Sequence, residues 1–81
     1  MTGIEQVLAL VRIYGTARQL SAATVSTRFL GGGRVVRNLV EGRDMGTRRI
    51  ERAIDQFARE WPADAVWPDG VARPFPAGAA E

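Results

Sequence analysis

The residues with the clearest capacity for chemistry lie in one short stretch, "GGGRVVRNLVEGR", at positions 31–43. Arg34 and Arg37 can each donate two hydrogen bonds to guanine O6 and N7, and Asn38 can pair in the same way with adenine. Arginine also binds phosphate through two parallel hydrogen bonds. The stretch therefore indicates either nucleic-acid recognition or an amphipathic helix whose polar side chains only face water.

The chain offers little for catalysis. Among its 81 residues there is no cysteine, no histidine and no lysine. The usual general base, the commonest metal ligand and the thiolate and amine nucleophiles are therefore all missing, and no pair of carboxylates marks a cleft. We expect a protein that is not an enzyme, that has no metal site and that needs no cofactor.

Three consecutive glycines, Gly31 to Gly33, raise the alternative of a loop that cradles a nucleotide phosphate. Such a loop needs a preceding strand and a fixed order of glycines, followed in one of its two forms by a lysine. Here a helical pattern precedes the glycines, lysine is absent, and 81 residues cannot build the required α/β sheet. We expect the glycines to form a turn between two helices.

Apolar residues at helical spacing predict the elements on either side of that turn. The first helix covers residues 2–18, where Thr2 and Glu5 form the pattern of a capping box. Gly15 either caps this helix or lies within its last turn. A second helix follows an N-cap at Ser21.

A third helix is predicted at about residues 34–41, ended by Gly42, and a fourth at about 47–60. The small residue where the second and third helices cross is predicted to be Ser26. The side chains predicted to face the core from these two helices are Val25, Phe29, Val36, Leu39 and Val40. The apolar stripe of the fourth helix consists of Ile50, Ala53, Ile54, Phe57 and Trp61.

Residues 20–60 resemble the lambda-repressor-like family, also called XRE-type helix-turn-helix regulators, and most closely its short alphaproteobacterial and phage-related members. The residues that carry the resemblance are Leu20-Ser21, Val36-x-x-Leu39, Gly42-Arg43 and Thr47, the last in the place of the Ser/Thr cap of the fourth helix. The resemblance implies an all-α, small four-helix domain whose third helix reads the major groove of double-stranded DNA.

The residues expected to touch DNA come from the second and third helices and from the start of the fourth. They are Ser21, Thr27, Arg28, Gly33, Arg34, Arg37, Asn38, Arg43, Thr47 and Arg48. Ser21 is both an N-cap and a candidate phosphate contact. For Arg48 and its neighbour Arg49, pairing with charged residues of the same helix is an equal alternative.

Charge and proline divide the chain at Pro62. Residues 1–60 carry ten arginines and six acids, whereas residues 61–81 carry one arginine and three acids. We therefore assign residues 1–61 to a helix-turn-helix DNA-binding domain and residues 62–81 to an extended Trp/Pro-rich tail. We expect Trp61, at the end of the domain, and Trp67 of the tail to pack back on the helices, and residues 77–81 to be disordered.

These features predict a sequence-specific regulator of transcription that binds double-stranded DNA as a homodimer. The alternative is a helix-turn-helix module that docks on the transcription machinery or another regulator, with the tail at 61–76 as a protein-binding segment. The N-terminal helix carries charged residues within its apolar pattern, which argues against a signal peptide or a membrane span. We expect a cytoplasmic, nucleoid-associated protein.

Overall fold

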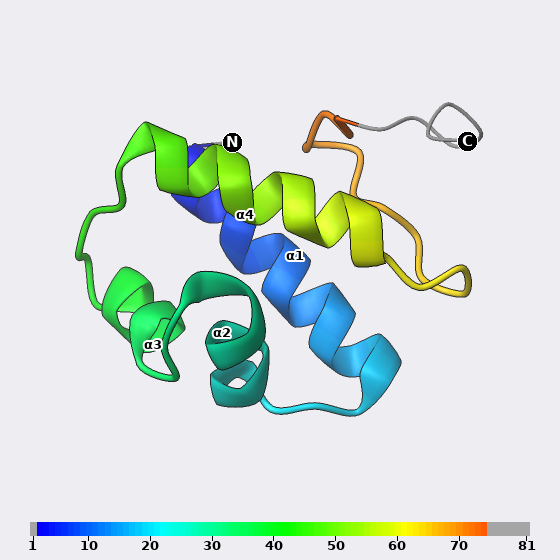
Figure 1. Cartoon of the computed structure of the whole chain (residues 1–81), viewed down its shortest axis with the longest axis horizontal. Coiled ribbons are helices and arrows are strands. Elements are labelled where there is room, and N and C mark those ends of the chain that lie inside the picture. The colour runs from blue at the N-terminus through cyan, green and yellow to red at the C-terminus, as the bar shows by residue number, and fades with distance from the viewer. Residues whose placement is uncertain (1, 75–81) are drawn as a thin grey trace.

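The computed structural model describes residues 2–74, which form four helices and no strand. The helices are α1 (Gly3–Arg18), α2 (Ala22–Leu30), α3 (Val35–Val40) and α4 (Thr47–Glu60). Figure 1 shows α4 crossing α1, with α2 and α3 on one side of that pair. The predicted all-α fold is confirmed, and α4 has the predicted bounds. α3 is shorter than the predicted 34–41 by one residue at each end.

α1 is fixed at both ends by local hydrogen bonds. At its start the Thr2 N–H donates to Glu5 Oε1 at 2.8 Å, and the Glu5 N–H donates to Thr2 Oγ1 at 3.1 Å. Donation by the Thr2 N–H holds the pKa of the Glu5 carboxyl below its ordinary value, because it stabilises the charged form. At the other end Gln19 adopts a left-handed conformation, and the Leu20 N–H donates to the Gly15 carbonyl at 2.8 Å.

Gly15 lies inside α1 and does not cap it, which decides between the two predicted alternatives. A Cβ atom at this position would lie 2.9 Å from the Leu20 carbonyl oxygen, closer than real side chains approach. It would also touch Val25 of α2 at 3.6 Å. Glycine is therefore required here because the chain turns back against its own helix.

One aromatic core joins α1, α2 and α4. Phe57 of α4 is fully buried and stacks on Phe29 of α2, with ring centroids 4.0 Å apart. Tyr14 of α1 meets Phe29 edge-on at 4.8 Å. α3 adds the buried Val36 and Leu39 to this core, as predicted. The core therefore fixes the four helices against one another.

Val40 does not face the core, and that prediction is wrong. Its side chain is 69% exposed. Val35, which was not assigned to the core, is half-buried and packs against it. Successive residues of an α-helix lie about 100° apart, so burial of Val35 beside Leu39 and Val36 turns Val40 toward solvent.

The chain turns back after α4 (Figure 1). Trp61 and Trp67 pack against the core of the helices, as predicted. Trp61 Nε1 donates to the Ala65 carbonyl at 2.9 Å, and Trp67 Nε1 donates to the Val71 carbonyl at 2.6 Å. The two rings meet edge-on, with centroids 5.0 Å apart. The predicted disorder of residues 77–81 lies outside the described residues.

The left-handed residue at the end of α1 gives a test of the fold. Gln19→Gly is expected to raise the free energy of unfolding by about 1 kcal/mol, since glycine adopts this conformation without the cost that a side chain brings. Arg18→Gly, one residue earlier and helical, is the control and is expected to lower it by about as much. Urea denaturation measures both. If the two substitutions destabilise equally, the left-handed assignment is contradicted.

Candidate functional site

Ser26 connects α2 to α3. Its side chain is fully buried, and its hydroxyl donates to the Gly32 carbonyl while accepting the Val36 N–H at 3.1 Å. The Val36 N–H belongs to the first turn of α3, where no intrahelical carbonyl is available. Arg34, the N-cap residue of α3, makes no side-chain cap bond. Ser26 therefore caps α3 from the neighbouring helix.

Gly31 and Gly33, two of the three glycines at the turn, suit their positions for different structural reasons. Gly31 ends α2 in a left-handed conformation, with φ of 86°, which a side chain rarely adopts. Gly33 lies close to α2, because a Cβ atom there would be 3.1 Å from Thr27 Oγ1. The glycines therefore serve a sharp turn and a close approach of α3's start to α2.

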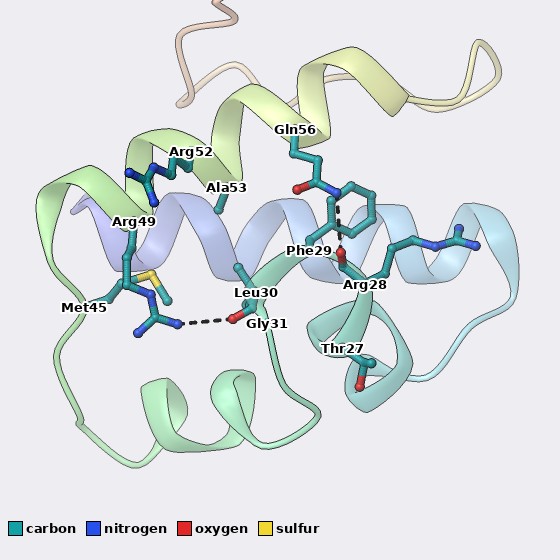
Figure 2. Close-up of a pocket in the computed structure, with 10 residues that line it drawn as sticks. All are labelled: Thr27, Arg28, Phe29, Leu30, Gly31, Met45, Arg49, Arg52, Ala53 and Gln56. Carbon is teal, nitrogen blue, oxygen red and sulfur yellow. Dashed lines mark hydrogen bonds between the residues drawn. The ribbon is translucent and has the colours of Figure 1, made fainter.

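The C-terminal turn of α2 is tied to α4. Arg49 Nη2 donates to the Leu30 carbonyl at 3.1 Å, and Gln56 Nε2 donates to the Arg28 carbonyl at 3.4 Å. Figure 2 shows these bonds at a hollow of about 380 Å³ between the two helices. Carbonyls at a helix end lack intrahelical donors, so both side chains act as caps. Arg49 thus has a role different from the ion pairing and the phosphate contact considered for it.

A second hollow, of about 430 Å³, lies between the first turn of α2 and the outer face of α3. We call it the α2–α3 groove; its lining residues are Ala22, Ala23, Gly33, Arg34, Val36, Arg37, Val40 and Glu41. Arg37 Nε donates to Glu41 Oε2 at 3.2 Å within this groove. The guanidinium of Arg34 is exposed and has no hydrogen-bond or ion-pair partner among residues 2–74. The groove therefore carries one paired and one unpaired arginine.

The ten predicted site residues do not lie together: some line the α2–α3 groove, some line the hollow between α2 and α4, and the others line neither. Those that line the α2–α3 groove are Gly33, Arg34 and Arg37. Thr27 and Arg28 line the hollow between α2 and α4 instead. The residues that line neither hollow are Ser21, Asn38, Arg43, Thr47 and Arg48.

Several of these side chains already have partners. Ser21 caps α2 as predicted, accepting the Thr24 N–H at 3.2 Å. Thr27 Oγ1 donates to the Ala23 carbonyl at 3.1 Å, one turn earlier in the same helix. Arg28 Nη1 donates to the Tyr14 hydroxyl at 3.0 Å. Arg28 therefore also links α2 to α1.

The predicted cap at Thr47 is wrong. Gly46 occupies the N-cap position of α4 and makes no side-chain cap bond, and Thr47 is the first helical residue. A cap requires a side-chain oxygen on the residue before the helix, in an extended conformation. The Thr47 hydroxyl comes one position too late for this role.

Sequence reasoning missed the acidic member of the groove, Glu41. The signal was present, since Arg37 and Glu41 are four residues apart and neighbours at that spacing meet on one helix face. The exposed Val40 and the alanines of α2 were also missed as lining residues. Val40 lines the groove because α3 is rotated about its axis relative to the prediction.

The segment that builds the α2–α3 groove carries only positive charge before Glu41, its last residue. Between Glu5 and Glu41 the chain has no acidic residue, and it has five arginines, at positions 12, 18, 28, 34 and 37. α2 and α3 themselves contain no acid. A surface of this kind attracts polyanions before any specific contact forms.

Comparison of the chain with protein-family models, with curated proteins and with solved structures finds no match. The resemblance to the lambda-repressor-like family therefore stays a prediction. Within residues 2–74 no helix combines the length and the apolar character that crossing a membrane requires.

Loss of the Ser26 hydroxyl tests its capping of α3. Ser26→Ala is expected to lower the free energy of unfolding by about 1–3 kcal/mol, because the buried Val36 N–H loses its partner and the Gly32 carbonyl keeps only the bond from the Val35 N–H at 3.3 Å. Native-state amide exchange at Val36 should accelerate. In the control Ser21→Ala, faster exchange should be limited to the first turn of α2. Unchanged exchange at Val36 in Ser26→Ala would contradict the assignment.

Proposed function

We propose that α2, the glycine turn and α3 form a helix-turn-helix that binds double-stranded DNA. In this proposal α3 lies in the major groove and the first turn of α2 faces the phosphate backbone. The observation that carries it is the Ser26 bridge, which holds α3 by its inner side and leaves Arg34 and Arg37 on the outer side. The residues that fix the helix are thus separate from those that contact the ligand.

The dimensions of α3 suit this role. An α-helix with its side chains is about 10–12 Å across, and a major groove about 12 Å wide accepts it. Arg34 and Arg37 are three residues apart, which is about 4.5 Å along the axis. Base pairs rise by about 3.4 Å, so the two guanidinium groups can reach neighbouring pairs.

The proposed contacts divide into base readers and phosphate contacts. We assign base contact to Arg34, Arg37 and Asn38. We assign phosphate contact to Ser21, Arg43, Thr47 and Arg48, which flank α2 and α3 along the chain. Thr27 and Arg28 already donate to Ala23 and Tyr14, so they contact DNA only by sharing or breaking those bonds.

A single module of this size buries too little surface for tight specific binding, so the proposal includes a homodimer on a two-fold or repeated site. Two-fold symmetry of the protein would then appear as symmetry of the operator. A role in transcription regulation and a place on the nucleoid follow from sequence-specific DNA binding.

A protein ligand is the second candidate, and the composition of the α2–α3 groove favours it. Val40 is largely exposed there, beside Ala22 and Ala23 of α2. Apolar side chains of this kind suit a partner helix, although a thymine methyl group also makes such contacts. A protein-docking module is expected to bind duplex DNA weakly and without sequence preference.

Salt dependence tests the DNA proposal. The full chain is expected to bind duplex DNA with log K falling against log salt concentration at a slope of about −3 to −4, since Arg43 and Arg48 of each protomer in the proposed dimer neutralise about four phosphates together. Fluorescence anisotropy at three salt concentrations measures this slope. Absence of duplex binding at the lowest salt would contradict the proposal and favour the docking module.

Selection of bound sequences from a pool of random DNA duplexes tests whether α3 contacts the bases. The wild-type chain is expected to enrich a sequence with a defined half-site, and Arg37→Ala is expected to lose preference at one position, worth about 1–3 kcal/mol. Arg12→Ala removes the same charge from the exposed side of α1 and should keep the selected sequence. Equal loss of preference in both variants would show that α3 is not the reader.

A further inference from the structure

The ion pair between Arg37 and Glu41 lies on the outer face of α3. It joins Arg37 Nε to Glu41 Oε2 at 3.2 Å, and the two side chains are 78% and 56% exposed. An exposed pair of this kind adds little to folding stability. Both residues line the α2–α3 groove, next to Arg34. The fold therefore does not depend on the pair, and its two side chains are available to a ligand of the groove.

The geometry of the pair leaves a defined set of donors on Arg37. A guanidinium group has five N–H donors in one plane. Glu41 takes the Nε–H, and Arg37 makes no other side-chain hydrogen bond within residues 2–74. Four donors remain, on Nη1 and Nη2. These two nitrogens form the end-on fork, which matches two acceptors such as guanine O6 and N7.

The charge of Glu41 also selects between ligands. Its carboxylate is the only acidic group lining a groove that otherwise carries Arg34 and Arg37. A carboxylate repels a phosphate, whereas a base edge carries no net charge. Glu41 therefore lowers the affinity of Arg37 for the DNA backbone more than its affinity for a base.

We propose that Glu41 is a positioning residue for base recognition, an inference that rests on the DNA-binding function proposed above. By holding the Nε–H of Arg37, Glu41 aims the Nη1 and Nη2 atoms at a single guanine in the major groove. Its negative charge keeps the same guanidinium from the phosphates. Glu41 thus increases specificity at the expense of affinity for DNA of any sequence.

Three variants of the full chain test this role. Glu41→Ala removes both the acceptor and the charge, and Glu41→Gln removes the charge but keeps an oxygen that can accept the Nε–H. Glu51→Ala is the matched control, because it removes an exposed acid from α4 outside the α2–α3 groove. Circular dichroism should be the same for all of them, since both positions are exposed.

The measurement is the affinity for the selected sequence and for its three single-base variants at the position where Arg37→Ala loses preference. The wild-type chain should prefer guanine there by roughly tenfold or more. Glu41→Ala should reduce this preference at least about threefold, bind random-sequence DNA more tightly, and steepen the salt slope by about 1. Glu41→Gln should retain more of the preference, and Glu51→Ala all of it.

The outcomes separate this inference from the function on which it rests. If Glu41→Ala keeps the full guanine preference while Arg37→Ala loses it, the positioning role is wrong and base reading by Arg37 stands. If Glu51→Ala reduces the preference as much as Glu41→Ala, the effect is one of net charge and the inference is overturned. If the wild-type chain selects no sequence, the proposed function fails and the inference with it.

Discussion

A helix of six residues is too short to persist on its own, so the position of α3 depends on what holds its first turn. In this chain that is the hydroxyl of Ser26, which accepts from Val36 and donates to Gly32 in a fully buried place. A buried hydroxyl is costly unless it is hydrogen-bonded, and here it both donates and accepts. These two hydrogen bonds give partners to the Ser26 hydroxyl, to the Gly32 carbonyl in the turn and to the Val36 N–H at the start of α3.

This bridge determines which surfaces remain available. The inner side of α3 is occupied by Val36 and Leu39, and its start is bound to α2. The arginines of the chain consequently serve two purposes. Arg28 and Arg49 tie α2 to α1 and α4, whereas Arg34 and Arg37 lie on the outer side of α3. Of these four arginines, only Arg34 and Arg37 can bind a polyanion without loss of a contact between helices.

Local patterns were sufficient for most of the fold. The capping box of α1, the N-cap at Ser21 and the bounds of α4 were predicted from neighbours within one or two helical turns. Contacts between distant segments were not predictable in this way. The bond from Arg49 to the Leu30 carbonyl spans 19 residues, and no periodicity indicates it. The rotation of α3, which exposes Val40, is likewise set by packing on the core.

In the candidate site, too, local patterns were predictable from the sequence and contacts between distant residues were not. The sequence indicated Gly33, Arg34 and Arg37, which line one groove, because glycine and arginine at this spacing have a recognisable chemistry. The four-residue spacing of Arg37 and Glu41 was present as well, but Glu41 was missed because an acid within a basic surface is unfavourable until its pairing with Arg37 is seen. The role of Ser26 was predicted only as a small residue at a helix crossing. Its two hydrogen bonds required the three-dimensional arrangement.

In the proposed function, the outer face of α3 and the first turn of α2 form the surface that meets duplex DNA. Mapping of amide chemical shifts of the full chain, titrated with a short duplex at low salt, tests this claim directly. The shifted amides are expected to cluster at residues 21–23 and 33–43, while those around Arg12 and Trp67 stay unchanged. Shifts concentrated on α1 or on the segment after α4, with α3 unaffected, would contradict it.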